Sequence, residues 1–139
     1  MDWESFQING ESYIAVANVW NNTHNQNSNI YKWNGSTFVL AQSIATTGNH
    51  DWESFVFNGE TYLVSANISS DTSVNINSNI YKWNGSSFSI VQTVATNGAV
   101  SWESFVMNGE AYLAVANHYN GTTYNINSNI YKLSLANAP

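Results

Sequence analysis

The residues best suited to binding chemistry are a tryptophan and the glutamate that follows it, found three times along the chain. The pairs are Trp3-Glu4, Trp52-Glu53 and Trp102-Glu103. An indole ring stacks on the apolar face of a sugar ring, while carboxylate and amide groups bind its hydroxyls in fixed directions. With the asparagines that recur around each pair, this set predicts a multivalent, lectin-like carbohydrate-binding protein whose partner is a glycan or glycoprotein.

The predicted binding residues share the same phase in each copy of the pattern. They are Trp3, Glu4, Asn18, Asn27 and Asn29, then Asp51, Trp52, Glu53, Asn67, Asn77 and Asn79, then Trp102, Glu103, Asn117, Asn127 and Asn129. A structural interpretation stands beside this one. Each glutamate shares a strand face with a phenylalanine and can be a buried acceptor of N–H bonds, and each asparagine can close a turn of its own backbone.

The sequence gives no support for a catalytic site or a metal-binding site. Glu11, Glu60 and Glu110 lie at the opposite end of a strand from the Trp-Glu pairs, on the order of 20 Å away at ~3.3 Å per residue. Glycoside hydrolysis needs two carboxyl groups within roughly 5 to 10 Å. The three histidines occupy different phases and have no matching acidic partners, so we expect no enzyme, no metal and no cofactor.

A repeat of about fifty residues organises the whole chain. Residues 2–6, 51–55 and 101–105 carry one motif, and residues 27–32, 77–82 and 127–132 carry a second, in the same phase. We therefore expect a single domain, 1–139, made of three repeats at 1–50, 51–100 and 101–139. Such units bury their apolar faces only by stacking on copies of themselves.

The first two repeats are each predicted to contain four strands, and the third is predicted to lack its fourth strand. In the first copy the alternating residues 3–8 form a half-buried strand, and Asn9-Gly10 is a strong signal for a type I′ hairpin turn. Residues 13–18 form an apolar interior strand, and a variable polar stretch, 19–26, leads to a third strand at 27–33. Asn34-Gly35 turns the chain into a fourth strand at 38–46, and residues 47–50 connect to the next copy.

Four antiparallel strands in up-and-down order are typical of a β-propeller blade. A β-trefoil or a β-prism with internal threefold symmetry also holds three four-stranded units in a chain of this length. The third copy favours blades, because no counterpart of the fourth strand follows residue 133. A blade that lacks its outermost strand exposes one edge, whereas a closed barrel would be left with a gap.

Several strings resemble the EAR repeat, also called EPTP. They are residues 62–67, 79–85, 88–92 and the run from Thr96 to Phe105. The resemblance implies an extracellular or cell-surface role and propellers of seven blades that recognise proteins. Three repeats are too few to close a propeller, so we expect a homodimer that completes six blades. A fragment of a longer chain or an engineered repeat protein would explain the same pattern.

In a meander the tight turns gather at one end and the long connections at the other, where the predicted sites would lie. A protein-recognition role would instead use the central opening or the variable loops 19–26, 68–74 and 118–124. Net charge is −6 with three basic residues in all, which argues against nucleic acid and anionic membranes as partners. No stretch reaches the ~20 apolar residues of a membrane span, so no membrane insertion is expected.

Overall fold

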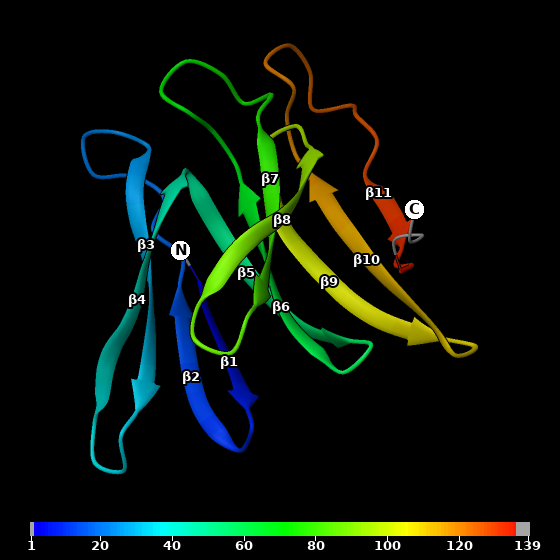
Figure 1. The fold of residues 1–139 in the computed structure, drawn as a ribbon. Coiled ribbons are helices and arrows are strands. Elements are labelled where there is room, and N and C mark those ends of the chain that lie inside the picture. The colour runs from blue at the N-terminus through cyan, green and yellow to red at the C-terminus, as the bar shows by residue number, and fades with distance from the viewer. Residues whose placement is uncertain (1, 136–139) are drawn as a thin grey trace.

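A computed structural model describes residues 2–135, which form eleven β-strands (Figure 1). The strands are β1 (Trp3–Ile8), β2 (Glu11–Val16), β3 (Asn25–Trp33), β4 (Phe38–Thr47), β5 (Asn49–Phe57), β6 (Glu60–Asn67), β7 (Asn77–Trp83), β8 (Phe88–Ala95), β9 (Ala99–Met107), β10 (Glu110–Asn117) and β11 (Asn129–Lys132). They group into three antiparallel sheets in the orders β1-β2-β3-β4, β5-β6-β7-β8 and β9-β10-β11. The all-β class and the three repeated meanders expected from the sequence are confirmed.

The first hairpin of every sheet has the predicted turn. Asn9, Asn58 and Asn108 have φ values of 51°, 53° and 52°, and the glycine after each is also at positive φ. Two consecutive left-handed residues define a type I′ turn, whose twist matches that of the strands it joins. The turn after the third strand differs, because Asn34 is not left-handed. Its side-chain Oδ1 instead accepts hydrogen bonds from the backbone N–H groups of Ser36 and Thr37.

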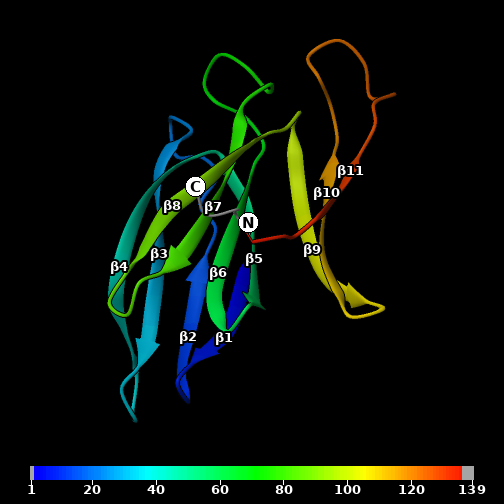
Figure 2. The ribbon, with the colours of Figure 1, turned by 45° about the vertical axis from the view of Figure 1, so that its right-hand side comes forward.

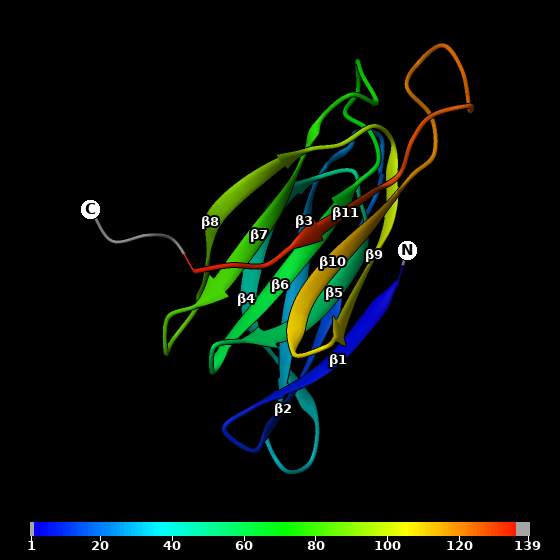
Figure 3. The same cartoon turned by 90° about the vertical axis from the view of Figure 1, so that its right-hand side faces the viewer.

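The three sheets stack face to face (Figures 2 and 3). Their first strands, β1, β5 and β9, are neighbours in space. One apolar cluster joins Ala15 and Ile30 of the first sheet to Trp52 and Phe88 of the second. A second cluster continues the stack from the second sheet to the third, where Trp102 lies. Each sheet therefore has a leading face, toward the preceding sheet, and a trailing face, toward the next.

This stacking fits propeller blades and not the alternative folds. In a prism every sheet turns the same face to a common core, whereas the second sheet here is covered on both faces. Leu63 packs toward the first sheet and Val64 toward the third, and both are fully buried. The β-trefoil or β-prism alternative is thus unsupported, and the three sheets form an open arc of blades. Closure of that arc into a ring is a separate question.

The third sheet has three strands within residues 2–135, with β11 as its outer edge. Within these residues no further sheet covers the trailing face of the third sheet, and the equivalent isoleucines of the three copies show this difference. Ile30 and Ile80 are 1% and 8% exposed, whereas Ile130 on β11 is 67% exposed. The expected end of the third repeat runs past Leu135, and its last residues, 136–139, lie outside the described part of the chain.

Two glycines let consecutive blades approach closely. Gly48 and Gly98 sit at the links between sheets with φ of +56° and +53°. A Cβ on Gly48 would lie 2.0 Å from the carbonyl oxygen of Ser69, and one on Gly98 would lie 2.7 Å from that of Tyr119. Backbone therefore contacts backbone here, where only glycine fits.

Candidate functional site

Two of the three glutamates of the Trp-Glu pairs, Glu4 and Glu53, join one blade to the next, whereas Glu103 is exposed. Glu4 Oε2 accepts hydrogen bonds from the backbone N–H and the hydroxyl of Ser54, at 2.7 and 2.9 Å. Glu53 Oε2 accepts the same two bonds from Ser104, at 2.7 and 2.8 Å. One carboxylate thus satisfies two donors of the neighbouring inner strand. Burial raises the pKa of Glu53, while the two bonds from Ser104 oppose that shift.

The tryptophans take part in the same junctions. Trp52 donates its indole N–H to the carbonyl of Val16, at 3.2 Å, and Trp102 donates to that of Ser65, at 2.9 Å. Both rings are almost fully buried, at 1% and 3% exposure, whereas Trp3 on the open leading face of the first blade is 65% exposed. Trp3 is therefore the one indole of the three that is open to solvent.

A pair of aspartates lies at the inner ends of the first two blades. Burial and a hydrogen bond with Asp2 raise the pKa of Asp51 to about 7, although its Oδ2 accepts the N–H of Trp102 at 3.2 Å. The hydrogen bond with Asp51 lowers the pKa of Asp2, which is exposed. Two neighbouring carboxyl groups repel each other when both are ionised, and this repulsion opposes ionisation of Asp51, the more buried of the two.

These acidic groups line a hollow of about 440 Å³ along the inner strands. His50 lies at its rim, where its Nδ1 is 2.9 Å from the carbonyl of Val100, which fixes the proton on that nitrogen. Within residues 2–135 no group of three or more His, Cys, Asp or Glu side chains is arranged to hold a metal ion. No helix in that part of the chain has the length and apolar character needed to span a bilayer.

The asparagines that end the second strands cap their own loops. Asn18 Nδ2 donates to the carbonyl of Asn27 at 2.7 Å, and the matching amides of Asn67 and Asn117 donate to the carbonyls of residues 77 and 127. Their backbone N–H groups donate to a serine hydroxyl in each copy. This is the turn-closing role that the sequence left open as an alternative.

The remaining predicted asparagines lie along the third strands. Asn29 Oδ1 accepts the hydroxyl of Ser43 at 2.8 Å, across to the fourth strand. Asn79 is half-buried, with its backbone N–H on the hydroxyl of Ser65. The side chains of Asn27, Asn77, Asn127 and Asn129 are exposed. The structure therefore brings the Trp, Glu and Asp residues together along the inner strands but separates the two buried indoles from these exposed amides.

The long loops between the second and third strands lie at one end of the stack, as expected for a meander, and they contact one another, which the sequence did not predict. Asp71 accepts the backbone N–H of His24 at 2.6 Å, lies 2.8 Å from its Nδ1, and accepts the hydroxyl of Thr23. These bonds, that from Thr23 foremost, lower the pKa of Asp71. Asn75 Nδ2 donates to the carbonyl of Asn120 at 2.8 Å. Three loops of unrelated sequence thus form one surface, seen at the top of Figure 1.

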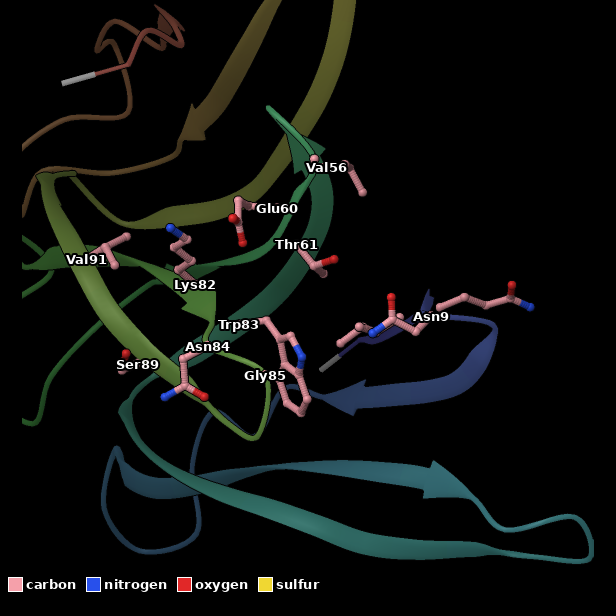
Figure 4. Close-up of a pocket in the computed structure, with 13 residues that line it drawn as sticks. Asn9, Val56, Glu60, Thr61, Lys82, Trp83, Asn84, Gly85, Ser89 and Val91 are labelled. Carbon is pink, nitrogen blue, oxygen red and sulfur yellow. The ribbon is translucent and has the colours of Figure 1, made fainter. Parts of the chain in front are cut away.

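A hollow of about 710 Å³ lies at the tight-turn end between the first two blades (Figure 4). Trp83 and Lys82 of β7 line it together with Glu60 and Thr61 of β6 and Asn9 of the first hairpin turn. An indole, an ammonium and a carboxylate therefore border one open space. This place is far along the strands from the Trp-Glu pairs.

A family model described as the EPTP domain matches residues 1–34, 37–84 and 87–134. The chain belongs to the EPTP domain family. This match confirms the resemblance to EAR repeats that was inferred from the sequence. Curated relatives are the thrombospondin-type laminin G domain and EAR repeat-containing proteins of Homo sapiens, 50% identical over 50 residues, and Mus musculus, 46% identical over 50 residues. In both cases the match covers 34% of this chain and 8% of the relative.

The EPTP unit does not coincide with a blade. The second matched segment, 37–84, begins with β4, the outer strand of the first blade, and ends after β7 of the second. The third, 87–134, likewise begins with β8 and ends after β11. These two EPTP units therefore each supply the outer strand of one blade and the three inner strands of the next, whereas the first matched segment, 1–34, contains only β1, β2 and β3.

Proposed function

We propose that the chain is a non-enzymatic binding module that recognises a protein partner through the surface of its three long loops. The proposal rests on the observation that the repeated residues and the variable residues have different roles. Glu4, Glu53 and the two buried tryptophans use their polar groups in hydrogen bonds between blades. The loops at 19–26, 68–74 and 118–124 differ in sequence, yet hydrogen bonds between His24 and Asp71, and between Asn120 and Asn75 just after the second loop, join them into one surface.

The loop surface has the side chains that dominate protein interfaces. Trp20 and Tyr124 are exposed, and Tyr124 stacks on Tyr119 at 4.5 Å between ring centroids. Large aromatic side chains supply much of the binding energy at such interfaces. Because few charges stand on these loops, we expect a partner held by aromatic contacts and hydrogen bonds rather than by long-range attraction.

The test is binding of labelled protein to cultured human cells by flow cytometry, before and after treatment of the cells with trypsin or with glycosidases. We expect trypsin to abolish binding and glycosidases to leave it. The double variant Trp20→Ala, Tyr124→Ala should lose binding. The control Trp33→Ala, an exposed tryptophan at the tight-turn end, should keep it. Binding that survives trypsin or the double variant would refute the proposal.

We also propose the homodimer expected from the sequence. The trailing face of the third blade repeats the faces that cover Trp52 and Trp102, and the leading face of the first blade presents Trp3. In a head-to-tail pair, Trp3 of one copy would donate to the carbonyl of Val115 of the other, and Glu103 would accept Ser5. Two such junctions would close six blades around a twofold axis.

Sedimentation velocity from micromolar to millimolar protein tests the assembly. A concentration-dependent dimer is expected, with Trp3→Ala and Glu103→Ala each shifting it to higher concentration. The control Trp20→Ala should leave association unchanged, because that side chain lies on the loop surface. A monomer throughout this range would remove the six-bladed ring.

Carbohydrate binding is the second candidate, and the hollow of Figure 4 favours it. The ring of Trp83 borders that space beside Lys82 and Glu60, which is a set of groups suited to a sugar. Titration of mono- and disaccharides into the protein, followed by tryptophan fluorescence, tests it, with Glu60→Gln and Lys82→Gln as variants. No fluorescence change at millimolar sugar would exclude this role.

A further inference from the structure

The outer edge of the third blade is open in a way that the first two blades define. In them the fourth strand, β4 or β8, pairs with the third along its length. The hydroxyl of Thr46 meets that of Ser28 at 2.8 Å, and Thr96 meets Ser78 at 2.9 Å, with all four residues buried. The equivalent Ser128 is exposed, and within residues 2–135 no strand pairs with the outer edge of β11.

The first residue of β8 shows how such a strand is held by the preceding blade. Gln42 Nε2 donates to the carbonyl of Phe88 at 2.9 Å, and Gln42 Oε1 accepts the N–H of Phe88 at 2.8 Å. One side-chain amide therefore forms hydrogen bonds with both the backbone N–H and the backbone carbonyl of one residue. The ring of Phe88 is buried against Trp83 and meets Phe6 edge-on at 5.9 Å between centroids.

The third blade has equivalent positions, and no fourth strand occupies them within residues 2–135. Gln92 occupies the position of Gln42 and is exposed. Leu133 replaces Trp83, and Phe55 is the counterpart of Phe6, with both phenylalanines half-buried. A groove of about 410 Å³ lies between Gln92 and Leu133. Its walls are the outer part of the second blade, including Gln92 and Val94, and the leading face of the third, including Tyr131 and Leu133.

We propose that this groove binds an extended strand of the β4 and β8 type, supplied by the opening segment of another EPTP unit. The family match identifies that occupant, because each complete unit begins with the outer strand of the blade before it. The bound strand pairs with β11, its aromatic residue enters the groove as Phe88 enters the equivalent place, and Gln92 binds the backbone of that residue. Strand addition of this kind draws affinity from main-chain bonds and specificity from the side-chain pocket.

The chain itself provides the probe. A synthetic peptide with the sequence of residues 85–98 contains Phe88, Gln92 and Thr96 in the spacing of a native fourth strand. We expect the fluorescently labelled peptide to bind the intact protein saturably in fluorescence anisotropy. Hydrogen exchange of the amides of Asn129–Lys132 should slow on binding. A peptide of the same composition in scrambled order serves as the control.

Two changes separate the groove from non-specific pairing at a sheet edge. Replacing the phenylalanine of the peptide by alanine should weaken binding at least about tenfold. Gln92→Ala in the protein should weaken it by about the same factor, since two hydrogen bonds are lost, whereas Gln7→Ala, an exposed glutamine on β1, should have no effect. Absence of binding at millimolar peptide, or equal affinities for these variants, would overturn the proposal.

Discussion

Glu53 Oε2 accepts both the backbone N–H of Ser104, at 2.7 Å, and its hydroxyl, at 2.8 Å, across the junction between the second and third blades. Glu103 is the same residue of the next copy, is exposed, and has no such partner within the described chain. The two glutamates therefore form a matched pair that differs only in the presence of a following blade.

Replacement of Glu53 by alanine should lower the free energy of unfolding by about 1–3 kcal/mol, because Ser104 loses the acceptor of two half-buried donors. Glu103→Ala should change it by less than about 0.5 kcal/mol in dilute protein. Urea denaturation of both variants measures the difference. Equal losses would mean that the carboxylate acts within its own strand and not across the junction.

The buried tryptophan should matter far more than its exposed counterpart. Trp52→Ala removes a ring that is 1% exposed, and the expected loss is about 3–5 kcal/mol. Trp3→Ala removes a ring from the open leading face and should cost well under 1 kcal/mol in dilute protein. Thermal unfolding followed by circular dichroism measures both. A large loss for Trp3→Ala would show that the first face is covered in solution.

The link glycines should tolerate no side chain. Gly48→Ala places a Cβ 2.0 Å from the backbone oxygen of Ser69 in addition to its left-handed strain, so we expect a loss of roughly 2–5 kcal/mol. Gly59→Ala is the control, since its φ is +75° but nothing lies within 4 Å, and it should lose only about 1–2 kcal/mol. Chemical denaturation would contradict this account if the two variants were equally stable.

Stability should decrease as pH rises toward neutrality. The pKa of Asp51 is about 7 in the folded chain against an ordinary value of 3.8, so the folded state binds more protons between these values. The free energy of unfolding therefore falls across that window and levels off above it. The raised pKa of Glu53 also lowers the free energy of unfolding as pH rises. The lowered pKa values of Asp2 and Asp71 have the opposite effect, and they act in more acidic solution.

Asp51→Asn tests this origin, because asparagine keeps an acceptor for Trp102 and a donor for Asp2. The variant should lose most of the decline in melting temperature between pH 5 and pH 8 that the unmodified protein shows. An unchanged slope in the variant would place the effect on another group.

Local sequence patterns were sufficient for the strands and the first turns. The alternation at residues 3–8 and the Asn9-Gly10 pair predicted β1 and its type I′ turn, and the structure confirms both. The start of β5 was predicted too late. Asn49 and His50 were assigned to a connection, but Asn49 pairs with Asn67 through a bulge, which single-sequence patterns do not reveal.

The environment of the site residues depended on the neighbouring blade. Alternation placed Glu4 and Phe6 on one face and Trp3 on the other, as observed, but it carries no information on which face another sheet covers. The contact of Asp71 with His24 was not predictable for the same reason, since it joins two loops that have no shared pattern. The glutamine that binds the backbone of Phe88 looked like an ordinary polar position of a strand.

The leading face of one copy is complementary to the trailing face of another copy, but neither face is complementary to itself. Copies that join through them must therefore all run in the same direction, and only a favourable rotation at each joint returns the last copy to the first. A small error in that rotation would yield an open helical filament that lengthens with concentration. The same surfaces that favour a discrete assembly thus create a risk of polymerisation, which coverage of a single terminal blade would suppress.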